Sequence, residues 1–267
     1  MPNGGYEMKL VRVLALSVLS MNFVFGISTV ALADSVLNQI LSEGKLKAGT
    51  TGDFNPFSVR DPATNKYKGY DIDIMSELAK DMGVEIEFVP TDWKTIVNGV
   101  VAGKYHITGS ASIKASRMKA AGFSESYLAV VFKPFTTSDK ETDFVGWDSI
   151  NREGVTVATT LGTAMEPLVK GWFPKATIKS VEAPARGYQE VLAGRADVFV
   201  TSNLEGSTLK VKYPNVKEVK VAAPRSPTPL AMLLPQADQV WINYVNHWIN
   251  IKTAKGFFDA TAEKWGL

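Results

Sequence analysis

The stretch GSASIKASRMKAAGFSESY, residues 109–127, organises both the predicted fold and the predicted site. It follows an apolar run typical of a β-strand, offers the hydroxyls of Ser110 and Ser112, and places Arg117 one turn further along. Open backbone N–H groups at a strand end and a guanidinium fork together match the two oxygens of a carboxylate. The alternative is a surface arginine in a basic helix, because two lysines flank it. This stretch alone does not separate the two interpretations.

The first 33 residues have the pattern of an export signal. Lys9 and Arg12 precede an apolar run that ends in Ala31-Leu32-Ala33. A positive segment, an apolar segment and a small-x-small site predict a secretory signal peptide over residues 1–33, cleaved before Asp34. Met8 is an alternative start. The competing interpretation, an uncleaved membrane anchor, is weaker because the run contains Asn22 and several Ser and Gly residues.

Charge and cysteine content exclude several functional classes. The formal net charge is +2, and loss of the leader would lower it to +1 by removing Lys9, Arg12 and Glu7. This balance gives no electrostatic case for nucleic acid or an anionic membrane. The absence of cysteine excludes disulfides, thiol catalysis and a lipid on an N-terminal cysteine. Two distant histidines do not form a metal site, so we expect no cofactor and no metal.

Strand-like and helix-like segments alternate along the mature chain, which indicates an α/β fold with a largely parallel sheet and ligand contacts at strand C-termini. Extended runs containing Pro134 and Pro227 predict two crossings between lobes. We therefore expect a discontinuous first lobe, residues 34–129 and 226–267, and a second lobe, residues 130–225, with hinge strands at both of its ends. A cleft between two such lobes is a natural site for a small ligand.

Several motifs in this order resemble those of periplasmic solute-binding proteins of the polar-amino-acid type, the capture subunits of ABC importers. Within that family the chain is most similar to the branch that contains cyclohexadienyl dehydratase. The motifs are Gly69-Tyr70-Asp71-Ile72-Asp73, Ser112 to Arg117, Phe123 to Tyr127, Gly194-Arg195-Ala196-Asp197, Thr50 to Phe54, Val89 to Trp93, and Tyr244 to Trp248. The resemblance implies a two-lobed periplasmic-binding-protein (type II) fold with two hinge crossovers.

The resemblance also implies a set of ligand-binding residues. Arg117 and Ser112 would hold the ligand carboxylate, and Ser110 would add a hydrogen bond. Thr163 would close on the carboxylate from the second lobe. The full predicted set is Phe54, Trp93, Ser110, Ser112, Arg117, Thr160, Thr163 and Ser202.

Ser202 departs from the pattern of amino-acid receptors, which place an aspartate there for the ligand's α-ammonium. A hydroxyl cannot offset a desolvated ammonium. The ligand would then lack that amine or hold its cation against an aromatic face.

Glu205 keeps a second interpretation open, because it stands where the dehydratase branch has its proposed general acid. A carboxylic acid in a dry cleft could protonate the leaving hydroxyl of prephenate or arogenate. Thr160 and Phe132 stand where that branch has Asn and Lys, so the expected partners of the acid are missing.

The sequence favours a monomeric periplasmic receptor that captures a small carboxylate-bearing solute and delivers it to an ABC permease in the inner membrane. The alternative is a cyclohexadienyl dehydratase with Glu205 as its acid. The ligand itself is not determined by the sequence.

Overall fold

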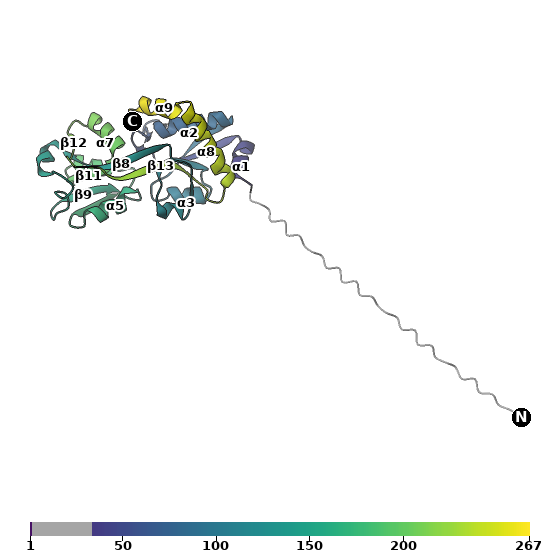
Figure 1. Cartoon of the computed structure of the whole chain (residues 1–267), viewed down its shortest axis with the longest axis horizontal. Helices are drawn as coiled ribbons and strands as arrows, with labels where there is room; N and C mark the ends of the chain where they lie inside the picture. The colour runs from purple at the N-terminus through teal and green to yellow at the C-terminus, as the bar shows by residue number, and fades with distance from the viewer. Residues whose placement is uncertain (2–33) are drawn as a thin grey trace. The chain divides into compact units, whose positions relative to one another are not determined.

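Two ten-residue strands, β8 (Leu128–Thr137) and β13 (Arg225–Leu234), pair antiparallel in the middle of the main sheet (Figure 1). β8 carries the chain from one half of the sheet into the other, and β13 brings it back. These are the segments in which the sequence predicts the two crossings. The structure, a computed structural model, describes residue 1 and residues 34–267. The predicted leader therefore lies outside the described residues.

One half of the sheet, here named the β1 half, is built from the beginning and the end of the described chain. β1 pairs in parallel with β5 and β6, and β13 continues this half by pairing antiparallel with β6 and β7. Three short strands, β2 to β4, form a separate small sheet. The strands are β1 (Lys45–Thr50), β2 (Asp53–Phe54), β3 (Ser58–Arg60), β4 (Tyr67–Lys68), β5 (Glu85–Pro90), β6 (Ile107–Ser112) and β7 (Gly122–Phe123). The helices are α1 (Val36–Glu43), α2 (Tyr70–Met82), α3 (Ile96–Val101), α4 (Ala115–Met118), α8 (Gln239–Ala254) and α9 (Phe257–Trp265).

The other half, named the β9 half, is formed by the middle of the chain. β9 pairs in parallel with β10 and β11, whereas β11 and β12 pair antiparallel with β8. Its strands are β9 (Thr156–Thr160), β10 (Thr177–Val181), β11 (Val198–Ser202) and β12 (Val216–Glu218). Its helices are η1 (Ser138–Asp143), α5 (Met165–Trp172), α6 (Gly187–Leu192) and α7 (Asn203–Lys212).

The α/β fold class predicted from the sequence is confirmed, but the expected largely parallel sheet is only partly correct. Each half contains a parallel core, and the antiparallel pairs of the main sheet all involve one of the two long strands that connect the halves. A strand that returns from the far half runs against its neighbours, so the continuous sheet is mixed. The exact lobe boundaries remain a prediction.

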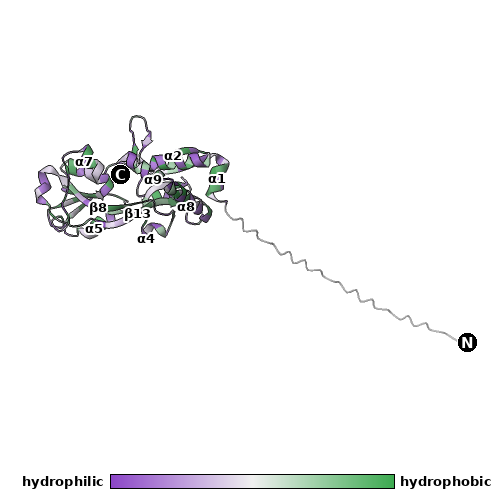
Figure 2. Cartoon of the chain, turned by 45° about the horizontal axis from the view of Figure 1, so that its top comes forward, coloured by the Kyte–Doolittle hydropathy of each residue, from purple (hydrophilic) through white to green (hydrophobic). Residues whose placement is uncertain are grey.

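Apolar side chains between the sheet and its helices hold the fold together. Trp241, Tyr70 and Phe57 are among the largest fully buried side chains. Trp241 on α8 also donates from Nε1 to the carbonyl oxygen of His106, 3.1 Å away. Figure 2 shows that the covering helices carry both hydrophobic and hydrophilic residues, as expected for helices with one buried face. Among residues 34–267, none of the helices has the length and hydrophobicity that a membrane crossing requires.

Candidate ligand-binding site

A cavity enclosing about 400 Å³ of space, its opening included, lies where several strands of both halves end. We name it the central cavity. It includes every predicted ligand-binding residue except Thr160. Its lining residues are Phe54, Trp93, Ser110, Ser112, Arg117, Val130, Phe132, Thr163, Ala164, Met165, Arg186, Ser202 and Leu230.

Arg117 brings a buried positive charge to this cavity from the short helix α4, directly after β6. The residue is only 4% exposed. Its Nη1 donates to the carbonyl oxygen of Ser112 at 3.3 Å, and its Nη2 has no hydrogen-bond partner among the described residues. Burial lowers the pKa of Arg117 to about 10. A desolvated guanidinium with an open donor is a strong site for an anion.

Ser110 is already engaged by the protein rather than open to a ligand. Its Oγ donates to Asp71 Oδ1 at 2.6 Å, and its backbone N–H donates to the Tyr127 hydroxyl at 2.6 Å. Asp71 is buried at the start of α2, and burial raises its pKa to about 7. Ser110 therefore lines the cavity while its hydroxyl anchors the end of β6. Sequence reasoning missed this role, although Asp71 belongs to a motif that it singled out.

Aromatic side chains form one wall of the cavity. Phe54, on β2, stacks on Phe57 with ring centroids 4.4 Å apart and meets the edge of Trp93 at 5.7 Å. The indole Nε1 of Trp93 donates to both carboxylate oxygens of Asp53 at 3.0 Å. Phe57 is fully buried behind this wall. The wall thus presents aromatic rings to the cavity, and the carboxylate of Asp53 holds the Trp93 ring in place.

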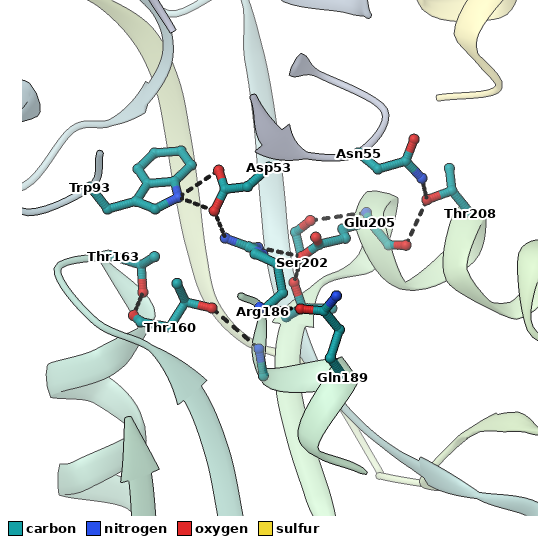
Figure 3. A network of polar contacts seen from close by, with 12 residues as sticks. Asp53, Asn55, Trp93, Thr160, Thr163, Arg186, Gln189, Ser202, Glu205 and Thr208 are labelled. Carbon is teal, nitrogen blue, oxygen red and sulfur yellow. Dashed lines mark hydrogen bonds and ion pairs between the residues drawn. The ribbon is translucent and has the colours of Figure 1, made fainter. Parts of the chain in front are cut away.

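Arg186 is a second buried cation in the cavity and was not anticipated from the sequence. It lies just before α6, is 3% exposed, and donates from Nη2 to Glu205 Oε2 at 2.7 Å. Its Nη1 lies 3.7 Å from Asp53 Oδ2, and its guanidinium carbon lies 5.3 Å from the ring centroid of Phe54. Figure 3 shows Arg186 between Asp53, from the β1 half, and Glu205, from the β9 half. This ion-pair network joins the two halves behind the cavity wall.

Comparison with known proteins now identifies the family. Residues 46–267 match the family of bacterial extracellular solute-binding proteins, family 3. The chain belongs to this family. It is 30% identical to the cyclohexadienyl dehydratase of Pseudomonas aeruginosa over 87% of this chain and 86% of that protein. It is 24% identical to an L-cystine-binding protein of Escherichia coli over 94% and 93% of the two chains.

A solved structure of an ancestral amino acid-binding protein, described as a precursor of cyclohexadienyl dehydratase, is also similar. Its TM-score is 0.80 at 34% identity, covering 86% of this chain and 99% of that one. These similarities confirm the periplasmic-binding-protein type II fold and the branch that the sequence motifs indicate.

Glu205 does not reach the central cavity of this solute-binding protein. It is fully buried on the first turn of α7, where Oε2 accepts from Arg186 and from the Thr201 hydroxyl. Burial raises its pKa, while the charge of Arg186 opposes this shift. Glu205 lines a smaller neighbouring space together with Thr160. The carboxyl group is therefore placed to hold Arg186 rather than to face the cavity.

The remaining predicted residues are held by local backbone contacts. Thr160, the last residue of β9, accepts on Oγ1 from the N–H of Gly187 at 3.3 Å. Thr163 donates from Oγ1 to the carbonyl oxygen of Thr160 at 2.7 Å, and it precedes α5, whose N-cap is Ala164. Ser202 is the N-cap of α7 and accepts on Oγ from the N–H of Glu205 at 3.1 Å.

The two halves also touch at the rim of the cavity. Asn55 Nδ2 donates to Thr208 Oγ1 at 2.8 Å, and Lys94 Nζ lies 2.8 Å from Glu182 Oε1. A Cβ atom added to Gly162 would lie 2.7 Å from the backbone nitrogen of Lys94. The halves are thus closed on each other in this structure. In the described part of the chain, no group of three or more His, Asp or Glu side chains is placed to hold a metal ion.

Proposed function

We propose that the protein is a periplasmic receptor of an ABC importer that captures a small carboxylate-bearing solute. The observation that carries this proposal is Arg117, a buried cation that lines the central cavity with an unpartnered donor. A carboxylate would supply both the missing negative charge and the acceptor for Nη2. The solute-binding function belongs to the family; the ligand and the transport step are our proposal.

Capture by closure of two lobes agrees with the position of the cavity. Its lining residues come from both halves, which are joined by β8 and β13. We take residues 34–129 and 226–267 as one lobe and residues 130–225 as the other. Hinge closure around a bound ligand is a known motion of periplasmic binding proteins. A solute between the lobes would stabilise the closed form by contacting both.

The relatives support transport as the purpose of capture. One relative in Haemophilus influenzae is described as a probable amino-acid ABC transporter-binding protein. The leader predicted over residues 1–33 would deliver this chain to the periplasm. There we expect it to act as a monomer and to meet a permease of the inner membrane.

A ligand screen combined with one variant tests the receptor. Purified protein is screened by thermal shift against amino acids, betaines, sulfonates, oxo acids and prephenate, and hits are measured by calorimetry. Arg117→Met should weaken binding of the best hit by at least about 2–3 kcal/mol, because it removes the charge that meets the carboxylate. Arg195→Met is a matched control, since Arg195 is 56% exposed and bound to Glu190. An affinity of Arg117→Met equal to that of wild type would show that Arg117 does not bind the ligand.

The alternative, a prephenate or arogenate dehydratase, is favoured by two observations: 30% identity to such an enzyme and the buried Glu205. Against it, Glu205 is held by Arg186 outside the cavity lining. We expect purified protein to consume neither prephenate nor arogenate. Formation of phenylpyruvate from prephenate that disappears in Glu205→Gln would overturn the receptor, since the amide keeps the shape but cannot donate an acidic proton.

A further inference from the structure

The central cavity contains two guanidinium groups and no carboxylate. Arg117 enters from the β1 half and Arg186 from the β9 half, and both are nearly fully buried. None of the lining residues, all within residues 34–267, is Asp or Glu. The polar groups of the lining are thus donors and hydroxyls. This is an unusual environment for a ligand that carries an ammonium group.

Arg186 is held by the protein on one side, and its other terminal nitrogen is buried without a hydrogen-bond partner in the described chain. Nη2 is used by Glu205, and the guanidinium lies over Phe54. Nη1, by contrast, has no hydrogen-bond partner in the described chain and lies 3.7 Å from Asp53, beyond hydrogen-bond length. An arginine fork carries several N–H donors, and a buried donor without a partner is costly. An acceptor atom of a bound molecule would satisfy this one.

The charge around each arginine decides what kind of acceptor fits. Two carboxyl groups, Asp53 and Glu205, already face Arg186, so the protein itself supplies the negative charge that neutralises this guanidinium. Arg117 has no ion-pair partner among the described residues. The cavity therefore offers one unbalanced positive charge, which suits one carboxylate, and one further donor, which suits an uncharged oxygen.

The same cavity would be unfavourable for the α-ammonium group of an amino acid. This group would lose its water in a cavity whose unbalanced charge, that of Arg117, is also positive, with no carboxylate in the lining to replace that water. The hydroxyl of Ser202, where amino-acid receptors carry a carboxylate, already accepts from the N–H of Glu205.

We propose that Arg186 is a second ligand-binding residue that selects an amine-free carboxylic acid with an additional oxygen acceptor, such as a 2-oxo acid, over the corresponding amino acid. This proposal rests on the receptor function argued above. Arg117 binds the carboxylate, and the open Nη1 of Arg186 donates to the oxo group. Arg186 thereby determines specificity, while Arg117 supplies affinity for acids of either kind.

Matched pairs of ligands test this selection. The pairs are phenylpyruvate and phenylalanine, 4-methyl-2-oxopentanoate and leucine, 2-oxoglutarate and glutamate, and pyruvate and alanine. Calorimetry reports binding, and so does intrinsic tryptophan fluorescence, to which Trp93 at the cavity wall contributes with the five other tryptophans. We expect the oxo acid of the best-fitting pair to bind at least tenfold more tightly than its amino acid.

Two arginine variants then separate the roles. Arg186→Lys keeps a positive charge near Asp53 and Glu205, so the fold is retained, but an ammonium lacks the fork that serves Glu205 and a ligand together. It should reduce the affinity for the oxo acid about tenfold and leave that for the amino acid unchanged. Arg117→Lys should weaken both ligands to a similar extent. Arg195→Lys, at an exposed arginine, should change neither.

The outcomes distinguish this inference from the receptor itself. An amino acid that binds more tightly than its oxo acid, or an unchanged preference in Arg186→Lys, overturns the role of Arg186 while the receptor function stands. Failure of both members of every pair to bind contradicts the inference and also counts against a carboxylate receptor.

Discussion

At the scale of single residues, the burial of the charged Arg117 side chain lowers the stability of the ligand-free protein. Its guanidinium is 4% exposed, and burial lowers its pKa to about 10, so the folded state disfavours its charge. We expect Arg117→Met to stabilise the ligand-free protein by about 1 kcal/mol or more, because the buried charge is replaced by an apolar side chain of similar length. Urea unfolding measures this change. A clear loss of stability would show that Arg117 supports the fold.

A second prediction concerns Asp71 and the pH dependence of the unfolding free energy. Burial raises its pKa from 3.8 to about 7, so the folded protein binds this proton more tightly than the unfolded chain. The resulting stability is fully present below about pH 4 and is lost as pH rises to about 7. Asp71→Asn removes this dependence. Between pH 4 and 7.5 its unfolding free energy should fall less than that of wild type, by on the order of 3 kcal/mol.

Urea unfolding at a series of pH values gives the comparison for Asp71. Asp143→Asn, which changes an exposed carboxyl, should follow the wild-type profile. Parallel profiles for wild type and Asp71→Asn would mean that Asp71 is ionised throughout, held by its bond from Ser110.

At the scale of elements, the start of α7 links the cavity to the network behind it. Ser202 lines the cavity and caps the helix, and Glu205 on the first turn holds Arg186. Ser202→Ala should cost about 1 kcal/mol of stability, because the N–H of Glu205 loses its acceptor. Ser207→Ala, on the exposed face of the same helix, should cost less than about 0.5 kcal/mol. Equal effects in thermal unfolding would deny the capping role.

At the scale of the whole molecule, Gly162 controls how closely the halves approach. Its φ is +78°, and an added Cβ would meet the backbone of Trp93 and Lys94. Gly154 has nearly the same φ, +79°, with nothing within 4 Å of an added Cβ. Gly162→Ala and Gly154→Ala should therefore both lose about 1–2 kcal/mol of stability from the backbone conformation. Only Gly162→Ala should also weaken ligand binding, by holding the lobes apart.

Small-angle X-ray scattering completes this test. Ligand should reduce the radius of gyration of wild type and of Gly154→Ala, but not of Gly162→Ala. Compaction of the Gly162 variant equal to that of wild type would show that the contact at Lys94 yields without hindering closure.

The sequence by itself determined the parts of the protein that depend on neighbouring residues. Ser112 and Arg117 lie five residues apart in one segment, so their joint position follows from a strand end and a single turn of helix. Phe54, Trp93 and Ser202 follow or end strands, and strand C-termini converge in an α/β fold. Their place in the cavity was expected from the resemblance to the family, whereas the α/β class and the two crossings followed from the pattern of the sequence itself.

The tertiary structure alone decided the network of Asp53, Arg186 and Glu205. Asp53 lies far from the other two in sequence, and its contact with Arg186 forms only where the two halves meet. No local pattern marks Arg186, which stands in a loop before a short helix. Its neighbours in space include Glu205, the candidate acid of the alternative, which pairs with Arg186 in this structure. Long-range charge pairing depends on how the halves close, and this is why the second guanidinium of the cavity could not be found from the sequence.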